Sequence, residues 1–171
     1  LSSFATGVTI VTAQDKESNP VGMTASSFNS VSVDPPLILW SVTKKAMSAP
    51  AFKEAKHFAV HVLATDQTDL SNRFAKSGAD KFSGTDHQID ANGVPVLAGC
   101  ATRFDCSNWE IYEGGDHWIV VGKVEGIDRA KKEGLVFGSG SYATAAPLTT
   151  IKQIPAKDTL TTDPVDGMLF Y

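Results

Sequence analysis

The strongest constraint on the fold is a pair of long, strand-like segments joined by a glycine turn. Residues 96–109 and 118–127 are rich in β-branched and aromatic side chains. Glu113-Gly114-Gly115-Asp116 lies between them, and two adjacent glycines are typical of a tight hairpin. The two segments are therefore expected to pair as antiparallel strands.

Shorter extended segments precede this hairpin. Residues 8–13, 37–42 and 58–63 are predicted to be strands, residues 21–33 are predicted to be extended, and the polar residues 15–20 are predicted to form a turn. The segment 21–33 is unusually polar, whereas 37–42 has the composition of a buried strand. These strands do not alternate with helices in the way that a parallel sheet requires.

Helical signals are few and short. A loop and a short helix, broken at Pro50, are expected over residues 44–56. A second helix is expected over residues 66–76, where Thr65 or Asp66 can cap its start. Many short strands with few helices favour a mainly β fold, such as a closed or split antiparallel barrel.

The composition suits one globular domain. The chain has 171 residues, 42% of them hydrophobic, and a formal net charge of −4. This apolar content excludes a disordered chain, and the mild acidity argues against a surface for nucleic acid or anionic membrane. The longest apolar run, residues 35–40, is far shorter than the roughly 18 residues of a membrane span. From residue 143 onward, polar and proline-punctuated sequence predicts a tail or linker.

The cysteines and histidines do not form a disulfide or metal motif. Cys100 and Cys106 lie in one strand-like run, about 20 Å apart, which is too far for a disulfide unless the strand folds back. Free thiols are therefore expected, and they fit a reducing cytoplasm. On a strand, His57 and His61 would lie about 13 Å apart, too far to share a metal ion. The prediction is no metal site and two partly exposed strand histidines.

Three segments are candidates for binding chemistry. In residues 24–32, six of nine side chains carry a hydroxyl or amide. This composition indicates either a binding site for a polar planar ligand or a polar strand at the edge of a sheet. Residues 41–48 contain two lysines and three hydroxyls, which indicate either a phosphate-binding site or an ordinary solvated loop. His117 follows the hairpin turn and is either a surface histidine or a mobile group that contacts a cofactor. Neither a Gly-x-Gly-x-x-Gly loop nor a Walker A loop is present in the sequence.

Five motifs occur in the order that is typical of a known family. They are Phe4-Ala5-Thr6-Gly7-Val8-Thr9-Ile10, Gly22-Met23-Thr24-Ala25-Ser26-Ser27-Phe28, Ser30-Val31-Ser32-Val33-Asp34-Pro35-Pro36-Leu37, Asp80-Lys81-Phe82 and Gly115-Asp116-His117. Over about residues 4–145 the chain resembles the flavin-reductase-like family of FMN-binding split barrels. Within that family it resembles the reductase component of two-component aromatic hydroxylases of the 4-hydroxyphenylacetate 3-hydroxylase type.

The resemblance implies a fold, a cofactor and a partner. Residues 1–145 are expected to form a Greek-key split β-barrel, mainly β with short helices, which assembles as a homodimer in the cytoplasm. NADH or NADPH would reduce FMN or FAD by hydride transfer from nicotinamide C4 to flavin N5. The reduced flavin would then pass to a separate oxygenase. Residues 146–171 are expected to be a tail or linker that leads into an absent C-terminal regulatory domain.

The resemblance also assigns site residues by position. The isoalloxazine edge is assigned to Thr24, Ala25, Ser26 and Ser27. The ribityl and phosphate groups are assigned to Ser41, Val42, Lys44, Lys45 and Ser48. Phe82 is expected to pack near the flavin, and the catalytic residue His117 is expected to face the nicotinamide with Tyr142 nearby. The chain departs from the family pattern at Ser26, where asparagine is common, and at Ala46-Met47, where a serine is common.

Two other functions are open at this point. One is a reductase that keeps its flavin tightly bound and reduces another acceptor, such as ferric iron or a small quinone. The other is a non-catalytic flavin-binding module. Because the motifs contain no carboxylate pair or Cys–His dyad, the chemistry is expected to come from the cofactor.

Overall fold

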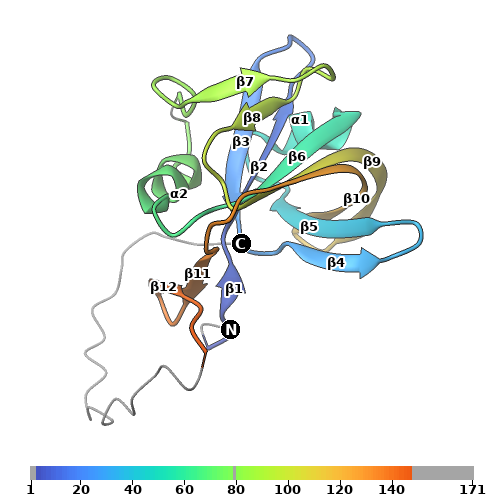
Figure 1. Ribbon diagram of the computed structural model, residues 1–171. Helices are drawn as coiled ribbons and strands as arrows, with labels where there is room; N and C mark the ends of the chain where they lie inside the picture. Colours follow the sequence, from blue (N-terminus) through green and yellow to red (C-terminus); the bar gives the residue numbers. More distant parts are fainter. Residues whose placement is uncertain (1–2, 79, 148–171) are drawn as a thin grey trace.

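The computed structural model describes residues 3–78 and 80–147, which form antiparallel strands and two short helices (Figure 1). The strands are β1 (Thr6–Gly7), β2 (Thr9–Gln14), β3 (Pro20–Ala25), β4 (Asn29–Ser32), β5 (Leu37–Thr43), β6 (His57–Val62), β7 (His87–Ile89), β8 (Pro95–Leu97), β9 (Thr102–Gly114), β10 (His117–Arg129), β11 (Leu135–Gly138) and β12 (Ser141–Thr144). The helices are α1 (Ala49–Glu54) and α2 (Thr68–Ala75). The fold is therefore mainly β, as the sequence predicts.

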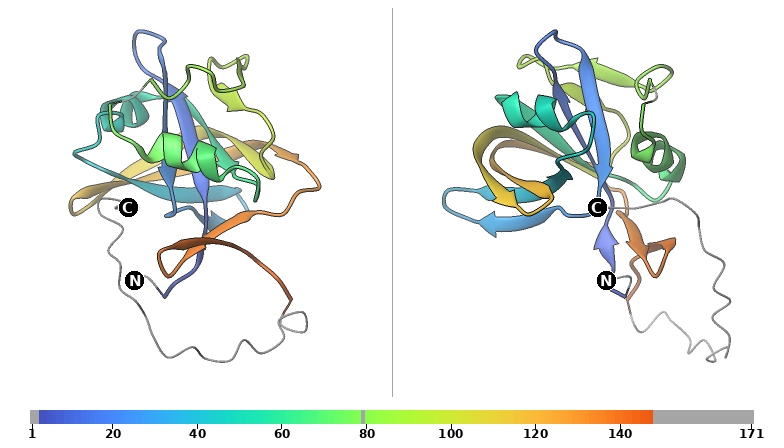
Figure 2. Two further views of the ribbon diagram at one scale, coloured as in Figure 1. Left: turned by 90° about the vertical axis from the view of Figure 1, so that its left-hand side faces the viewer. Right: turned by 180° about the vertical axis from the view of Figure 1, so that it is seen from behind.

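Seven strands form one sheet in the order β3-β2-β6-β9-β10-β5-β4. β3 and β4 lie at opposite ends of this order, yet only residues 26–28 join them. A flat sheet of this size would separate its ends by about 29 Å, whereas such a link spans at most about 14 Å. The sheet must therefore curl, and Figure 2 shows the strong bend of its long β9–β10 hairpin.

A serine pair fastens the β3 end of the curled sheet to β5, the strand next to its other end. The Ser27 hydroxyl donates to the Ser41 carbonyl at 3.2 Å and accepts from the Ser41 N–H at 2.8 Å. Ser27 lies in the link after β3 and Ser41 lies in β5, so this contact brings the end of β3 beside β5. Within the described residues, no backbone ladder joins β3 to β4 or β5.

The inner face of the sheet encloses the main core. Alternate residues of β5, namely Ile38, Trp40 and Val42, point into it and are at most 5% exposed. The Trp40 ring meets the Phe52 ring of α1 edge to face, with 4.8 Å between centroids. This aromatic contact holds α1 against the core.

A second core lies between α2, β8 and the small sheet β1-β11-β12. Its buried members are Val8, Ile10, Leu63, Phe74, Phe82, Leu97 and Leu135. The rings of Phe74 and Phe82 meet edge to face, with 5.1 Å between centroids. α2 and the loop that follows it are thereby packed onto the large sheet.

The segment 21–33, expected to be extended, contains two strands, β3 and β4, which residues 26–28 link. Two local expectations from the sequence are wrong. Pro50 does not break a helix but lies in the first turn of α1, where its missing N–H has no intrahelical partner to lose. Neither Thr65 nor Asp66 caps α2, which begins after Gln67 without a side-chain cap.

The long hairpin is confirmed with shifted bounds. β9 and β10 pair from Gly114 and His117 outward, across a two-residue turn. The strand predicted from residue 96 is interrupted by residues 98–101, which separate β8 from β9.

The last strand, β12, continues to Thr144, past the predicted start of the tail at residue 143. The division of the chain after residue 145 stays a prediction, since residues 148–171 lie outside the described part.

Both cysteines are free thiols, as predicted. Burial raises the pKa of Cys100 to about 11 and that of Cys106 to about 12, so neither thiol ionises at neutral pH.

Among the described residues, no three His, Cys, Asp or Glu side chains gather in a way that could hold a metal ion. None of the helices within residues 3–78 and 80–147 is long and apolar enough to span a membrane.

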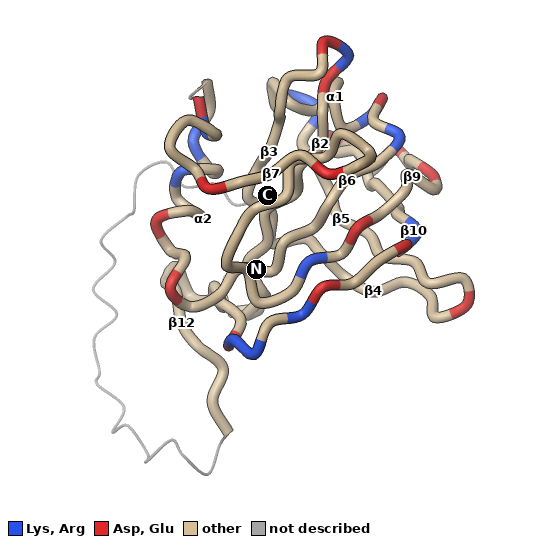
Figure 3. The backbone as a smooth tube through the Cα atoms, turned by 45° about the horizontal axis from the view of Figure 1, so that its top comes forward, with Lys and Arg blue, Asp and Glu red and all other residues tan. Residues whose placement is uncertain are grey.

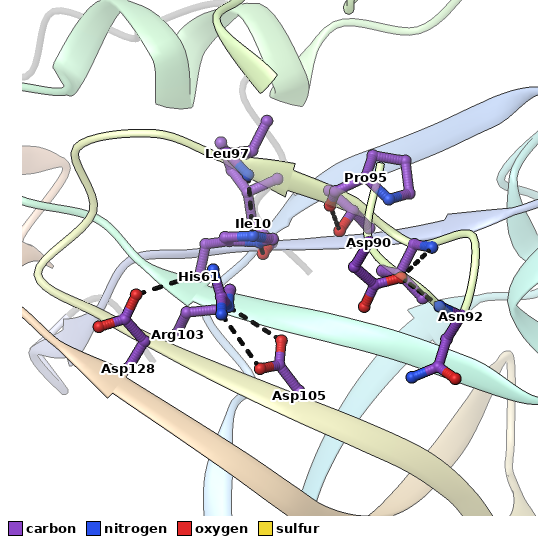
Figure 4. Close-up of polar contacts among 11 residues, drawn as sticks. Ile10, His61, Asp90, Asn92, Pro95, Leu97, Arg103, Asp105 and Asp128 are labelled. Carbon is purple, nitrogen blue, oxygen red and sulfur yellow. Dashed lines mark hydrogen bonds and ion pairs between the residues drawn. The ribbon is translucent and has the colours of Figure 1, made fainter. Parts of the chain in front are cut away.

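His61 is a fully buried histidine that ties three strands together (Figure 4). Its Nδ1 lies 3.1 Å from the carbonyl oxygen of Ile10 in β2, and its Nε2 accepts from the N–H of Leu97 in β8 at 3.1 Å. These two partners require a neutral imidazole that carries its proton on Nδ1. Burial lowers the pKa of His61 from 6.5 to about 4. The prediction that His61 is partly exposed is therefore wrong, whereas His57 is half-buried as predicted.

We expect the fold to lose stability between pH 6.5 and pH 4. In this window the unfolded chain binds a proton at His61 that the folded chain excludes, so the free energy of unfolding falls as the pH falls. A pKa that drops from 6.5 to about 4 corresponds to a loss of about 3 kcal/mol. Urea denaturation across this pH range measures it.

Two variants isolate the contribution of His61. His61→Gln keeps one donor and one acceptor without titrating, so it should flatten the pH profile. His57→Gln removes a half-buried histidine from the same strand and controls for the loss of an imidazole from β6. A wild-type slope in His61→Gln would contradict the assignment.

Candidate functional site

A cavity of about 730 Å³ opens between β3, the β5–α1 connection and the loop after α2. These segments are far apart in the sequence, and the curl of the sheet brings β3 close to β5. β3 contributes Gly22 and Thr24, the β5–α1 connection contributes Lys45 and Ser48, and the loop contributes Lys81 and Phe82. The lining therefore combines small, hydroxyl-bearing, cationic and aromatic residues.

Gly22 lets two aromatic rings approach the cavity wall. A Cβ at this position would lie 2.7 Å from Phe74 Cε1 and 3.2 Å from Phe82 Cζ. Both distances are shorter than ordinary van der Waals contact, so a side chain here would displace at least one ring. The wall beside β3 is aromatic because residue 22 has no side chain.

The loop that carries Phe82 is shaped by Asp80. Asp80 Oδ1 accepts the N–H groups of Phe82 at 3.2 Å and Ser83 at 3.1 Å, which is a local turn. The Lys81 ammonium then donates to the carbonyls of Gly22 at 3.1 Å and Phe74 at 2.9 Å. The motif Asp80-Lys81-Phe82 thereby fastens the loop both to β3 and to the last turn of α2.

Two hydroxyls hold α2 beside the cavity. Thr24 of β3 donates to the carbonyl of Ser71 at 2.7 Å. The Tyr142 hydroxyl of β12 lies 2.9 Å from the Ser71 hydroxyl and donates to Asn72 Oδ1 at 2.8 Å. Because β3 and β12 belong to different sheets, α2 is positioned from two sides.

The charges around the cavity differ in how they are balanced. Lys45 is exposed, and Lys81 is half-buried with a pKa that burial lowers. Lys44 points elsewhere: it pairs with Glu113 at 3.3 Å and lies 4.5 Å from the centroid of the Trp118 ring. Figure 3 shows acidic and basic residues interspersed along the described chain.

Four of the residues assigned from the sequence line the cavity: Thr24, Lys45, Ser48 and Phe82. Seven others contribute nothing to that lining: Ala25, Ser26, Ser27, Ser41, Val42, Lys44 and Tyr142. Ala25 and Val42 are buried in the main core, and the Ser27 hydroxyl is committed to Ser41. The roles of all eleven toward a flavin stay predictions.

His117 does not line the cavity, but its neighbour on the next strand does. It opens β10 and pairs in register with Thr43, which does line the cavity. Its Nδ1 lies 2.7 Å from Asp116 Oδ1, and this hydrogen bond lowers the pKa of Asp116. The assignment of His117 to the nicotinamide stays a prediction.

Gly22 and Lys81 are site residues to which the sequence analysis assigned no role. Both lie within the quoted motifs. A glycine inside a strand often marks a close approach of another group, which was a usable signal for Gly22. Nothing in the sequence shows that Lys81 is half-buried, because its carbonyl partners come from two other elements.

A second cavity, of about 330 Å³, lies beside β8. Its one lining cation, Arg103, is already paired with Asp105 at 2.9 Å and Asp128 at 3.8 Å (Figure 4). The thiol of Cys100, which also lines it, is protonated at neutral pH. Among the described residues, this cavity therefore offers neither an unbalanced cation nor a nucleophile.

The model of the flavin reductase like domain matches residues 1–146. The chain belongs to the flavin reductase like family. It is 46% identical over 142 residues to the FMN reductase (NADH) SmoA of Agrobacterium fabrum, and the match covers 83% of this chain and 80% of that protein. It is 40% identical to the reductase component of the flavin-dependent trigonelline monooxygenase of Acinetobacter baylyi, where the match covers 86% of this chain but 48% of that protein.

Solved structures of flavin reductase family members are similar in fold. The NADH:FAD oxidoreductase SgcE6 of Streptomyces globisporus, in complex with NAD and FAD fragments, matches with a TM-score of 0.81 and 37% identity over 86% of this chain and 90% of that one. The flavin reductase PheA2 matches with a TM-score of 0.76 and 32% identity over 85% of this chain and 94% of that one. The family resemblance seen in the five sequence motifs is confirmed.

The cavity of this flavin reductase family member suits a flavin. Its volume of about 730 Å³ falls within the range of roughly 300–1,000 Å³ that is typical of cofactor sites. The rings of Phe74 and Phe82 provide an apolar wall for a planar ring system. Lys45 and Ser48 place a cation and a hydroxyl in the same lining.

We expect Gly22→Ala to weaken flavin binding and to destabilise the fold. The added methyl group would push Phe74 or Phe82 out of place, at a cost of about 1–3 kcal/mol. Gly7→Ala is the matched control, since a Cβ at that strand glycine would meet nothing within 4 Å. Thermal unfolding and flavin fluorescence titration measure both effects, and equal results for the two variants would contradict the packing argument.

Proposed function

We propose that this chain is an NAD(P)H-dependent flavin reductase that supplies reduced FMN or FAD to a separate oxygenase. The observation that carries the proposal is a flavin-sized cavity with an aromatic wall and three lysines, in a chain of the flavin reductase like family. A relative at 46% identity is named FMN reductase (NADH), and another is named the reductase component of a monooxygenase. The proposed location is the cytoplasm.

The residues of this chain bind and orient rather than transfer protons. A bound flavin would supply the acceptor for a hydride from the nicotinamide, a transfer that would need no acid or base from the protein in the same step. Phe82 and Gly22 define the flat wall for the ring, and Lys45 and Ser48 take the phosphate. His117 lies at the start of β10, which pairs with β5, and its proposed role is to contact the nicotinamide.

The proposed architecture is a Greek-key split barrel. The short link at residues 26–28 and the Ser27–Ser41 hydrogen bonds support it, because they draw the two ends of the seven-stranded sheet together. The position of the cavity, where β3 and β5 approach each other, is consistent with a barrel that is split at this point.

The proposed assembly is a homodimer, supported by an outer apolar face of the sheet formed by Leu39, Ile119 and Tyr112. These residues lie on the neighbouring strands β5, β10 and β9, on the side opposite to Trp40. Leu39 and Ile119 are half-buried, and Tyr112 is exposed. The solvent face of an antiparallel sheet is usually polar, so a face of this kind suits contact with a second copy of the chain.

We expect Ile119→Asp to shift the protein from dimer to monomer, because it places a charge in the middle of this face. Ile127→Asp is the control, since Ile127 lies on the same strand but is already 64% exposed. Sedimentation at micromolar concentration distinguishes one chain from two. A wild-type protein that sediments only as a single chain would overturn the proposed dimer.

A direct assay separates the proposed function from its alternatives. NADH oxidation is followed by stopped flow with free FMN or FAD in the absence of an oxygenase. Fast oxidation with release of reduced flavin supports the proposal. Reduction of only a tightly bound flavin points to a reductase for another acceptor, and absence of turnover points to a non-catalytic binding module.

We expect Lys45→Ala to weaken FMN about tenfold more than riboflavin, or by ~1.4 kcal/mol, because riboflavin lacks the phosphate. Lys44→Ala is the matched control, because the adjacent lysine pairs with Glu113 and does not line the cavity. Fluorescence titration with each flavin gives the dissociation constants. Equal losses of FMN and riboflavin in Lys45→Ala would show the phosphate assignment to be wrong.

A further inference from the structure

Lys81 is a half-buried cation in the cavity wall that has no carboxylate partner within the described residues. Its ammonium donates to the carbonyls of Gly22 and Phe74, which uses two of its three N–H groups. By contrast, Lys44, just outside the cavity, is paired with Glu113. Partial burial disfavours the charged form of Lys81 and lowers its pKa.

The two carbonyls hold the ammonium at a defined place in the wall. One carbonyl belongs to β3 and the other to the last turn of α2, where the helix dipole favours a positive charge. Phe82 follows Lys81 directly, and its ring packs against Phe74. The cation therefore lies on the aromatic side of the cavity.

Of the three lysines that line the cavity, Lys45 and Lys76 are exposed and Lys81 is half-buried. Lys45 lies near Ser48 in the β5–α1 connection, where the phosphate is placed. Lys81 lies among aromatic rings on a different element, where the flavin ring is placed. A partly desolvated charge is costly unless an opposite charge balances it, so the setting of Lys81 suits a ligand that becomes negative.

We propose that Lys81 directs its third N–H toward the flavin ring and stabilises the negative charge that the ring carries after reduction; this inference rests on the proposed function. Hydride transfer moves one hydrogen with two electrons from the nicotinamide to the oxidised ring. The nicotinamide becomes a cation, and the neutral ring becomes an anion. A fixed cation beside the ring favours this product over the oxidised ring.

The test compares the affinities for oxidised and reduced flavin in wild type, Lys81→Gln and Lys81→Arg. Glutamine keeps an N–H donor for the two carbonyls but removes the charge, whereas arginine keeps the charge. Lys76→Gln is the matched control, because Lys76 lines the same cavity but is exposed. Fluorescence quenching reports oxidised FMN and riboflavin, and anaerobic competition reports the reduced forms.

We expect Lys81→Gln to lose at least tenfold more affinity for reduced than for oxidised flavin, with FMN and with riboflavin alike. That ratio equals a fall of about 30 mV in the potential of the bound flavin. Lys81→Arg should keep most of the wild-type ratio, and Lys76→Gln should keep all of it. If thermal melts show that Lys81→Gln does not fold, Lys81→Met provides the uncharged variant.

Other outcomes overturn the inference. Equal losses for both redox states would make Lys81 only an anchor for its loop. A loss for FMN that riboflavin does not share would assign Lys81 to the phosphate instead. If wild type binds flavin but the ratio is unchanged in Lys81→Gln, the inference fails while the proposed function stands; if wild type binds no flavin, both fail.

Discussion

The short link at residues 26–28 is the constraint on which the rest of the structure depends. It joins strands at opposite ends of a seven-stranded sheet, so the sheet can form only by curling until those ends lie within about 14 Å of each other. The Ser27 hydroxyl then fastens the link to both backbone groups of Ser41. The main core fills the inside of this curl, and the cavity opens where β3 approaches the β5–α1 connection.

The same packing that stabilises the fold also shapes the cavity. Phe74 is fully buried in the second core, and its ring also lines the cavity beside Gly22. Lys81 fastens the neighbouring loop to β3 and α2 with hydrogen bonds to two carbonyls. Stability and the shape of the proposed flavin site are therefore coupled in this wall, whereas Lys45 lies in an exposed connection where substitution costs little packing.

Much of the fold could be predicted, because hydrophobic alternation and turn chemistry are local. The hairpin around Gly114 and most strand positions follow from those signals. One error has a local cause too: Pro50 reads equally well as a breaker or as a first-turn residue. His61 looked half-exposed because its partners Ile10 and Leu97 are distant in the sequence.

The sequence by itself determined the family, the mainly β architecture and the segments from which the site is built. Only the tertiary structure decided which side chains of those segments face the cavity. Alternation along a strand separates two faces but does not say which face is covered, so Thr24 and Val42 looked equally suitable. The burial of a lysine and the presence of a carboxylate beside it depend on residues that the curled sheet brings together. For this reason only the structure shows that Lys81 is partly buried while Lys44 is paired with Glu113.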